Sequence, residues 1–244
     1  MQLDALAVRL RPRGGLEAAD LGVRLCQAAA RSVYPCYGVA ATPVALLAIA
    51  SAEWARWLPV LIIWWSKPWL DRTILFVLSR AAFGQPTGPS DVWDAQRHIW
   101  WRHLPLTLTL WRVSPWRSLT QPIHQLEGLT FRRARSRVAV IRKRAYGTAL
   151  MVSHVLSAAE AALTLALLSL VFWFAPAGST PTLPELMSGE LPALFTVGVP
   201  IAYGIAVLFL EPFYVAAGFA MYLNRRAEIE AWDIEQEFRR AFAA

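Results

Sequence analysis

Five ionisable residues lie inside apolar stretches of the chain, where charged side chains are rare. They are Lys67, Asp71, His154, Glu160 and Glu211. If these stretches cross a membrane, the five residues form an intramembrane polar layer in which each charge loses its water and requires a partner. Three kinds of chemistry fit such a layer: an ion-pair network that fixes helix register, a pathway for protons or a solute, or a catalytic site.

Two of these residues share a sequence context. Lys67 precedes Pro68 and Glu211 precedes Pro212, and each pair lies roughly 20 Å from the arginine that ends its apolar stretch. This pattern predicts two helix hairpins related by an axis along the membrane normal, with Lys67 paired to Glu211. Two alternatives remain: the prolines simply mark kinks, or Lys67 pairs with Asp71 one turn away.

The composition indicates a helical membrane protein. Of 244 residues, 56% are hydrophobic and only 17% are charged, well below the roughly 25% that is usual in soluble domains. The chain has 12 Trp, a residue enriched where transmembrane helices meet the membrane surface. The formal net charge of +7 comes from basic residues beside apolar runs, which fits membrane topology better than nucleic-acid binding, so no nucleic acid is expected.

The apolar runs predict an all-α fold with four transmembrane helices, at residues 33–52, 58–83, 145–175 and 193–224. We divide the chain into a cytoplasmic arm with an amphipathic surface helix (1–32), a first transmembrane hairpin (33–83), a basic cytoplasmic insert of short helices that follows the membrane (84–144), a second hairpin (145–224) and an acidic-aromatic cytoplasmic helical tail (225–244). The amphipathic helix, residues 16–32, either lies on the membrane surface or docks on the bundle.

The distribution of basic residues predicts the orientation. Arginine and lysine are concentrated in the arm, the insert and the tail, whereas residues 176–192 contain none and residues 52–57 contain only Arg56. By the positive-inside rule both termini and the insert are cytoplasmic. Residues 1–15 lack the apolar region of a secretory signal peptide, so the first spanning helix is expected to direct its own insertion.

The cytoplasmic side carries two segments that are suited to contacts. A basic run is expected to bind anionic lipids of the cytoplasmic leaflet or a partner; it contains Arg132, Arg133, Arg135, Arg137, Arg142, Lys143 and Arg144. The acidic tail interleaves apolar anchors, Ile229, Trp232 and Phe238, and is expected to dock on a partner or on this basic run. A simple solvated helix end is the alternative for the tail.

The sequence contains no recognisable catalytic or metal-binding motif. No HExxH, GxSxG or Gly-rich phosphate loop is present, and the four His do not have metal-ligand spacing. Cys26 and Cys36 are expected to be small buried fillers rather than a disulfide or a metal site. No catalytic residue, metal or cofactor is therefore expected.

Four stretches together resemble uncharacterised multi-pass inner-membrane proteins of Gram-negative bacteria, of the kind encoded near MoxR-type ATPases and transglutaminase-like proteins. They are LRPRGGLEAADLG, WWSKPWLDRTILFVLSRAAFG, SPWRSLTQPIHQLEGL and EPFYVAAGFAMYLNRRAEIEAWDIE. The resemblance spans most of the chain. It implies a bacterial inner-membrane location and a role in an envelope-related assembly, and it implies no established activity or catalytic residues.

Two functions are consistent with the sequence. The first is a non-enzymatic membrane scaffold or assembly partner that binds other membrane proteins or its own copies. The second is a subunit of a small channel or transporter that uses the intramembrane polar layer. Because four crossings make a small bundle, the second function requires an oligomer to enclose a pathway.

Overall fold

The computed structural model describes residues 13–101, 104–109, 114–176, 180–188 and 192–230, and these residues contain helices but no strand. The long helices are α1 (Gly15–Ala28), α2 (Ala30–Ser51), α3 (Leu58–Ala81), α7 (Phe131–Phe174) and α9 (Ala193–Glu230). The short elements are α4 (Pro89–Asp94), the π-helical turn η2 (Arg97–Trp101), α5 (Leu104–Leu108), α6 (Arg117–Leu126) and α8 (Leu183–Ser188). The prediction of an all-α fold is confirmed.

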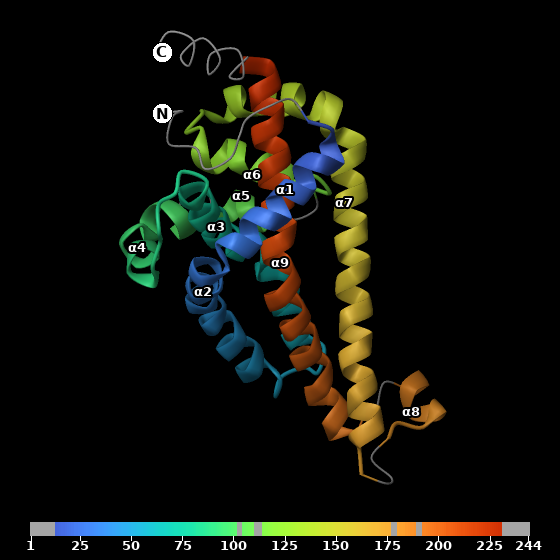
Figure 1. Ribbon diagram of the computed structural model, residues 1–244. Helices are drawn as coiled ribbons and strands as arrows, with labels where there is room; N and C mark the ends of the chain where they lie inside the picture. The colour runs from blue at the N-terminus through green and yellow to red at the C-terminus, as the bar shows by residue number, and fades with distance from the viewer. Residues whose placement is uncertain (1–12, 102–103, 110–113, 177–179, 189–191, 231–244) are drawn as a thin grey trace.

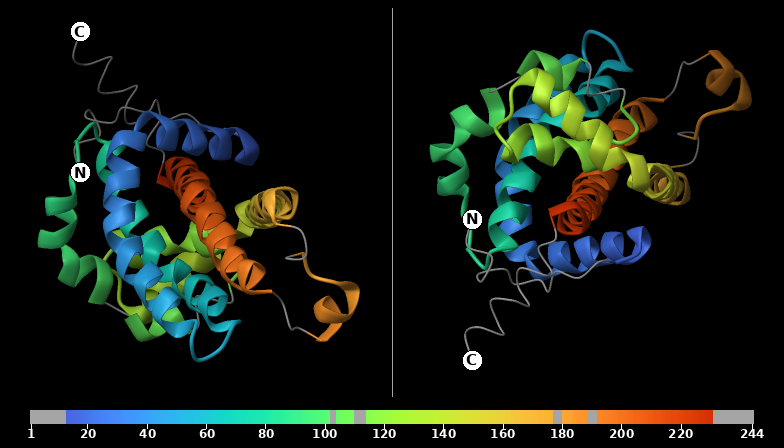
Figure 2. Two further views of the ribbon diagram at one scale, coloured as in Figure 1. Left: turned by 90° about the horizontal axis from the view of Figure 1, so that it is seen from below. Right: turned by 90° about the horizontal axis from the view of Figure 1, so that it is seen from above.

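Helix α9 forms the centre of the bundle. It packs against α1, α3, α6 and α7, while α2 pairs with α3 on the other side (Figures 1 and 2). The start of α1, the end of α9 and the basic first turns of α7 lie at one end of the molecule, and α8 lies at the opposite end (Figure 1). Helices α7 and α9 therefore run between the two ends of the molecule (Figure 1).

Three helices are long and apolar enough to cross a membrane. They are α2, residues 132–174 of α7 and residues 194–230 of α9. Helix α3 has sufficient length, with 24 residues, but it is not among the three candidate spans. Four charged residues, Lys67, Asp71, Arg72 and Arg80, reduce its hydropathy.

The second half of α3 is a buried core helix. From Lys67 to Leu78 almost every side chain is enclosed, because α2 and α9 cover one side and the short elements η2, α5 and α6 cover the other. A helix that is surrounded by protein can carry polar groups, provided that its neighbours supply partners. The predicted insert thus packs around α3.

The N-terminal amphipathic helix is docked on the bundle. It ends at Ala28, where Ala29 leaves helical geometry, and α2 starts at Ala30 rather than at residue 33 as the sequence pattern indicated. A Cβ atom at Gly22 would lie less than 3.0 Å from the backbone of Ala216 in α9. This glycine lets α1 cross α9 at backbone contact, which corresponds to the docked alternative.

The boundary expected between insert and second hairpin, at residues 144–145, falls within a continuous helix. Helix α7 begins at Phe131 and runs without a break to Phe174. The basic run therefore forms the first turns of this long helix rather than a separate short helix. The sequence has no helix-breaking proline there, since residues 131–174 contain none.

Candidate functional site

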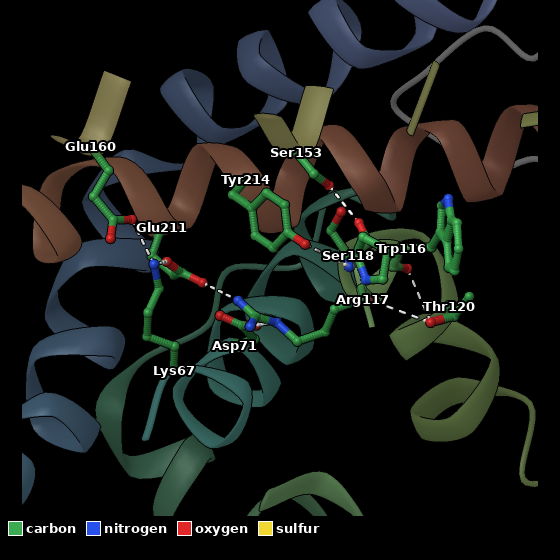
Figure 3. Close-up of polar contacts among 11 residues, drawn as sticks. Lys67, Asp71, Trp116, Arg117, Ser118, Thr120, Ser153, Glu160, Glu211 and Tyr214 are labelled. Carbon is green, nitrogen blue, oxygen red and sulfur yellow. Dashed lines mark hydrogen bonds and ion pairs between the residues drawn. The ribbon is translucent and has the colours of Figure 1, made fainter. Parts of the chain in front are cut away.

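A chain of alternating charges lies between α3, α6, α7 and α9 (Figure 3). The Lys67 ammonium of α3 lies 2.7 Å from Glu211 Oε2 of α9 and 2.6 Å from Glu160 Oε2 of α7. The predicted contact between Lys67 and Glu211 is thus present. The alternative pairing of Lys67 with Asp71 does not form, because Asp71 has a different partner.

That partner is Arg117 of α6, a residue that the sequence analysis did not assign to the polar layer. Its Nε lies 2.7 Å from Asp71 Oδ2, and one of its terminal nitrogens lies 2.6 Å from Glu211 Oε1. The five charges therefore follow the order Asp71, Arg117, Glu211, Lys67, Glu160. We call these five residues the charge chain.

The two ends of the charge chain differ in burial. The Glu160 and Lys67 side chains are 15% and 10% exposed, those of Arg117 and Glu211 are 7% and 2% exposed, and Asp71 is fully buried. A buried ion is tolerated only when paired and hydrogen-bonded, and Arg117 and Glu211 each have two oppositely charged partners. The charge chain thus connects four helices through groups that cannot be removed singly without stranding a charge.

A close helix contact brings Arg117 to this position. A Cβ atom at Gly218 of α9 would lie less than 3.0 Å from the backbone of Ser118, so only glycine allows α6 to approach so closely. Small residues have this role at helix interfaces in membranes. Tyr214 supports the same contact: its hydroxyl accepts a 3.4 Å hydrogen bond from Ser118 N–H, and its ring lies 5.1 Å from the Arg117 guanidinium carbon.

Arg72 follows Asp71 in sequence but faces away from the charge chain. Its guanidinium donates to Thr107 Oγ1 at 3.0 Å and to the His98 carbonyl at 3.2 Å. Gln125 of α6 donates to the Arg72 carbonyl at 2.8 Å. Elements η2, α5 and α6 are therefore tied to the second half of α3 by polar contacts.

A cavity of about 430 Å³ adjoins the Glu160 end of the charge chain. Its wall combines charged and hydroxyl side chains with apolar ones, principally Trp64, Lys67, Arg117, Ser153, His154, Ser157, Glu160, Glu211 and Tyr214. Ser153 donates to the Pro115 carbonyl at 2.7 Å, which fixes the segment before α6 against α7.

The structure brings together four of the five residues predicted for the polar layer. His154, the fifth, lines the cavity, and its Nδ1 lies 2.8 Å from the Leu150 carbonyl of its own helix rather than against a carboxylate. Arg117 was missed, although the predicted layer contained three acids and a single lysine. That imbalance was the available signal for a further cation.

A second polar cluster lies where the first turns of α7 meet the end of α9. Arg137 of α7 pairs with Glu230 of α9 and lies 3.3 Å from Glu127, which also accepts a 2.7 Å hydrogen bond from the Tyr222 hydroxyl. Arg226 pairs with Glu230 at 2.7 Å. The basic run and the end of α9 are thus in contact, through Arg137 and Glu230.

The residues predicted to bind lipids or a partner divide into two groups. Arg137 is engaged within the chain, and the Arg142 guanidinium carbon lies 4.8 Å from the Trp116 ring, so these two are half-buried. The others are exposed: Arg132, Arg133, Arg135, Lys143 and Arg144. Of the predicted tail anchors, Ile229 is 36% exposed, and Trp232 and Phe238 lie outside the described residues.

Within the described ranges, no group of three His, Cys, Asp or Glu side chains is arranged to hold a metal ion. Comparison with protein-family models, with curated proteins and with solved structures finds no match to the chain. The class of protein is therefore defined by the fold and the site alone. It is a helical protein with three helices long and apolar enough to cross a membrane and a buried charge chain.

Proposed function

We propose that the chain is a non-enzymatic scaffold or assembly partner of a bacterial inner membrane, where it takes part in an envelope-related complex. It crosses the bilayer four times, with α3 as the span that is not apolar enough to be recognised by composition. The three apolar helices and the length of α3 support this arrangement. The sequence resemblance supports the location.

The charges of α3 are compatible with a membrane span because protein encloses them. Lys67, Asp71 and Arg72 are each more than nine-tenths buried and have partners on neighbouring helices. An intramembrane charge is acceptable when it faces the interior of the bundle. The four crossings then form two hairpins, α2 with α3 and α7 with α9.

In this arrangement part of the insert enters the bilayer. Helix α6 meets α3 at Asp71 and α9 at Gly218, roughly 10–14 Å along each helix from Arg80 and Arg225, which mark the cytoplasmic boundary. Backbone of this kind is tolerated at membrane depth when protein surrounds it. We therefore place α6 as a short re-entrant helix that carries Arg117 into the bundle.

One observation carries the assembly role. None of the most apolar 18-residue window of α7 is buried in the bundle, whereas 33% of the window in α2 and 28% in α9 is buried. Helix α7 thus uses Ser153 and Glu160 for internal contacts, while the side chains of its apolar window are only partly buried or exposed. The partner that fits this surface is another integral membrane protein with an apolar transmembrane helix.

Site-directed photocrosslinking tests this role. A photoreactive amino acid at Leu165 or Leu170, both exposed on α7, is expected to crosslink a defined membrane protein in cells, while the same group at exposed Leu46 of α2 labels lipid. Affinity purification in mild detergent then identifies the crosslinked protein. Crosslinks to the chain itself would assign α7 to a homo-oligomer, and equal labelling from all three positions would contradict the assembly role.

The polar cavity favours a second candidate, a subunit of a small channel or transporter. The cavity touches four members of the charge chain, Lys67, Arg117, Glu160 and Glu211, and a polar cavity at membrane depth is a feature of solute pathways. This function predicts a homo-oligomer with conductance or solute flux in liposomes. If the protein were a monomer without conductance or solute flux, only the assembly role would remain.

A further inference from the structure

The cavity beside the charge chain is lined by residues of α3, α6, α7 and α9. Its rim includes Trp64 of α3 and His154 and Ser157 of α7, which are exposed on the outer surfaces of these helices. In the four-crossing arrangement these surfaces face the bilayer. A polar cavity at this position has to contain either water or the polar part of a lipid, because uncompensated polar groups in hydrocarbon are costly.

The α7 wall of the cavity offers hydrogen-bond acceptors. His154, Ser157 and Glu160 follow one another at intervals of three, so they share a helix face. The His154 Nδ1 faces the Leu150 carbonyl, which can only accept, so Nδ1 donates. The Ser157 hydroxyl and the Glu160 carboxylate can accept hydrogen bonds. A ligand rich in N–H donors complements this wall.

The charges that line the cavity balance, because Glu160 and Glu211 are matched by Lys67 and Arg117, and Asp71 does not line it. Glu160 is the most exposed member of the charge chain. The nearby cation Arg72 is directed at Thr107 and His98. The Glu160 end of the cavity thus offers a carboxylate to the cationic group of a ligand that carries no net charge.

We propose that the cavity binds the head group of a membrane amphiphile that carries a primary ammonium, with the phosphoethanolamine lipids as the probe class. The ammonium donates to the Glu160 carboxylate and the Ser157 hydroxyl, and the acyl chains leave between α3 and α7 into the bilayer. A volume of about 430 Å³ falls in the usual range for small-ligand sites, roughly 300–1,000 Å³. This inference rests on the proposed membrane placement and not on the assembly role.

Lipid binding to the purified full-length protein tests the proposal. Delipidated protein in detergent is titrated with phosphatidylethanolamine, with phosphatidylcholine of the same acyl chains, and with free ethanolamine. Native mass spectrometry counts bound lipid, and tryptophan fluorescence follows thermal unfolding. We expect one phosphatidylethanolamine per chain and a raised Tm, and a much weaker effect of phosphatidylcholine, because its quaternary ammonium has no N–H to donate.

Two variants with matched controls assign the binding to the cavity. Glu160→Gln is expected to weaken phosphatidylethanolamine binding about tenfold or more, because a hydrogen bond to a charged acceptor is lost. Ser157→Ala, which leaves every ion pair intact, is expected to weaken it by about two- to fivefold. Glu53→Gln, an exposed carboxylate outside the cavity, and Ser169→Ala, an exposed serine further along α7, are expected to bind as the native chain does.

The outcomes separate the possible ligands. Equal binding of phosphatidylethanolamine and phosphatidylcholine would overturn the proposal, as would native affinity in both Glu160→Gln and Ser157→Ala. If free ethanolamine raised the Tm as strongly as the lipid at the same concentration, the ligand would be a water-soluble amine and the membrane source would be excluded. The crosslinking from Leu165 and Leu170 is independent of these results, since neither residue lines the cavity.

Discussion

Gly218 of α9 and Ser118 of α6 are in backbone contact, with no space between them for a Cβ atom. Arg117, the neighbour of Ser118, reaches Asp71 and Glu211 only because α6 lies this close to α9. The position of Arg117 in the charge chain thus depends on the absence of a side chain at Gly218, on a different helix.

Gly218→Val is therefore expected to push α6 away from α9 and to separate Arg117 from its carboxylates. The loss of stability should reach at least the range of about 1–3 kcal/mol that is typical of overpacking. Thermal unfolding in detergent measures it. Gly204→Ala is the control on the same helix, since a Cβ atom there lies 3.7 Å from Ile63 Cδ1. If Gly218→Val and Arg117→Met were fully additive, the two positions would not be coupled.

The two glutamates that contact Lys67 are expected to differ in their contribution to stability. Glu211→Gln should destabilise the protein by about 3–5 kcal/mol, because Glu211 is almost fully buried and holds both Lys67 and Arg117. Glu160→Gln should cost less, since Glu160 is partly exposed and Lys67 keeps Glu211. The measurement is thermal unfolding of both variants; equal losses would mean that the charge chain does not have the observed order.

A charge swap between Lys67 and Glu211 is expected to fail. In Lys67→Glu with Glu211→Lys, the new lysine faces Arg117 and the new glutamate faces Glu160, so two like-charge contacts replace two attractive ones. The swapped protein should be less stable than either single variant, by thermal unfolding. Rescue by the swap would show that Lys67 and Glu211 act as an isolated pair.

The sequence was sufficient to predict the all-α fold and part of the charge chain. Lys67 and Glu211 could be paired because both lie in long apolar helices, where depth follows from residue number. Arg117 could not be placed in this way, because it is the first residue of a short helix that contains Pro122, so its depth does not follow from residue number. The path of α6 depends on Gly218, and a glycine in a transmembrane helix has many other uses. Similarly, the docking of α1 depends on one glycine contact with α9.

The proposed four-crossing topology makes a labelling prediction. In Cys26- and Cys36-free protein, cysteines at Glu53 and Ser188 should react with an impermeant maleimide in intact cells. Cysteines at Ser90 and Ser136 should react only after permeabilisation. All four positions are exposed, so access depends on the side of the membrane. Labelling of positions 53 and 90 from the same side would show that α3 does not cross.

Cys26 reports whether α1 is docked on α9. Burial raises the pKa of its thiol to about 12, so almost no thiolate is present at pH 8. In a Cys36→Ala background, native protein should resist alkylation at pH 8, and Gly22→Leu should make Cys26 reactive by displacing α1. Gly38→Ala is the control, because a Cβ atom there meets no neighbour within 4 Å. Rapid alkylation of Cys26 in the unsubstituted helix would contradict its docking.

The raised pKa of Cys26 also determines how this thiol changes the stability of the fold with pH. The unfolded chain releases this proton near pH 8.5–9, whereas the folded chain retains it until about pH 12. The buried thiol therefore contributes its full stabilisation below about pH 8.5, and this contribution decreases as pH rises. Cys26→Ala should flatten the decline in Tm above pH 9, and an unchanged slope would assign the decline to other groups.

The burial of α3 has a consequence for the order of synthesis. Lys67 and Asp71 leave the ribosome before any of their partners, since Arg117, Glu160 and Glu211 all follow them in the chain. The partners then arrive in chain order: Arg117 for Asp71 with α6, Glu160 for Lys67 with α7, and Glu211 for both cations with α9. A chain truncated after α6 would present Lys67 without an acidic partner from α7 or α9. The charge chain is therefore complete only when the last long helix has been made.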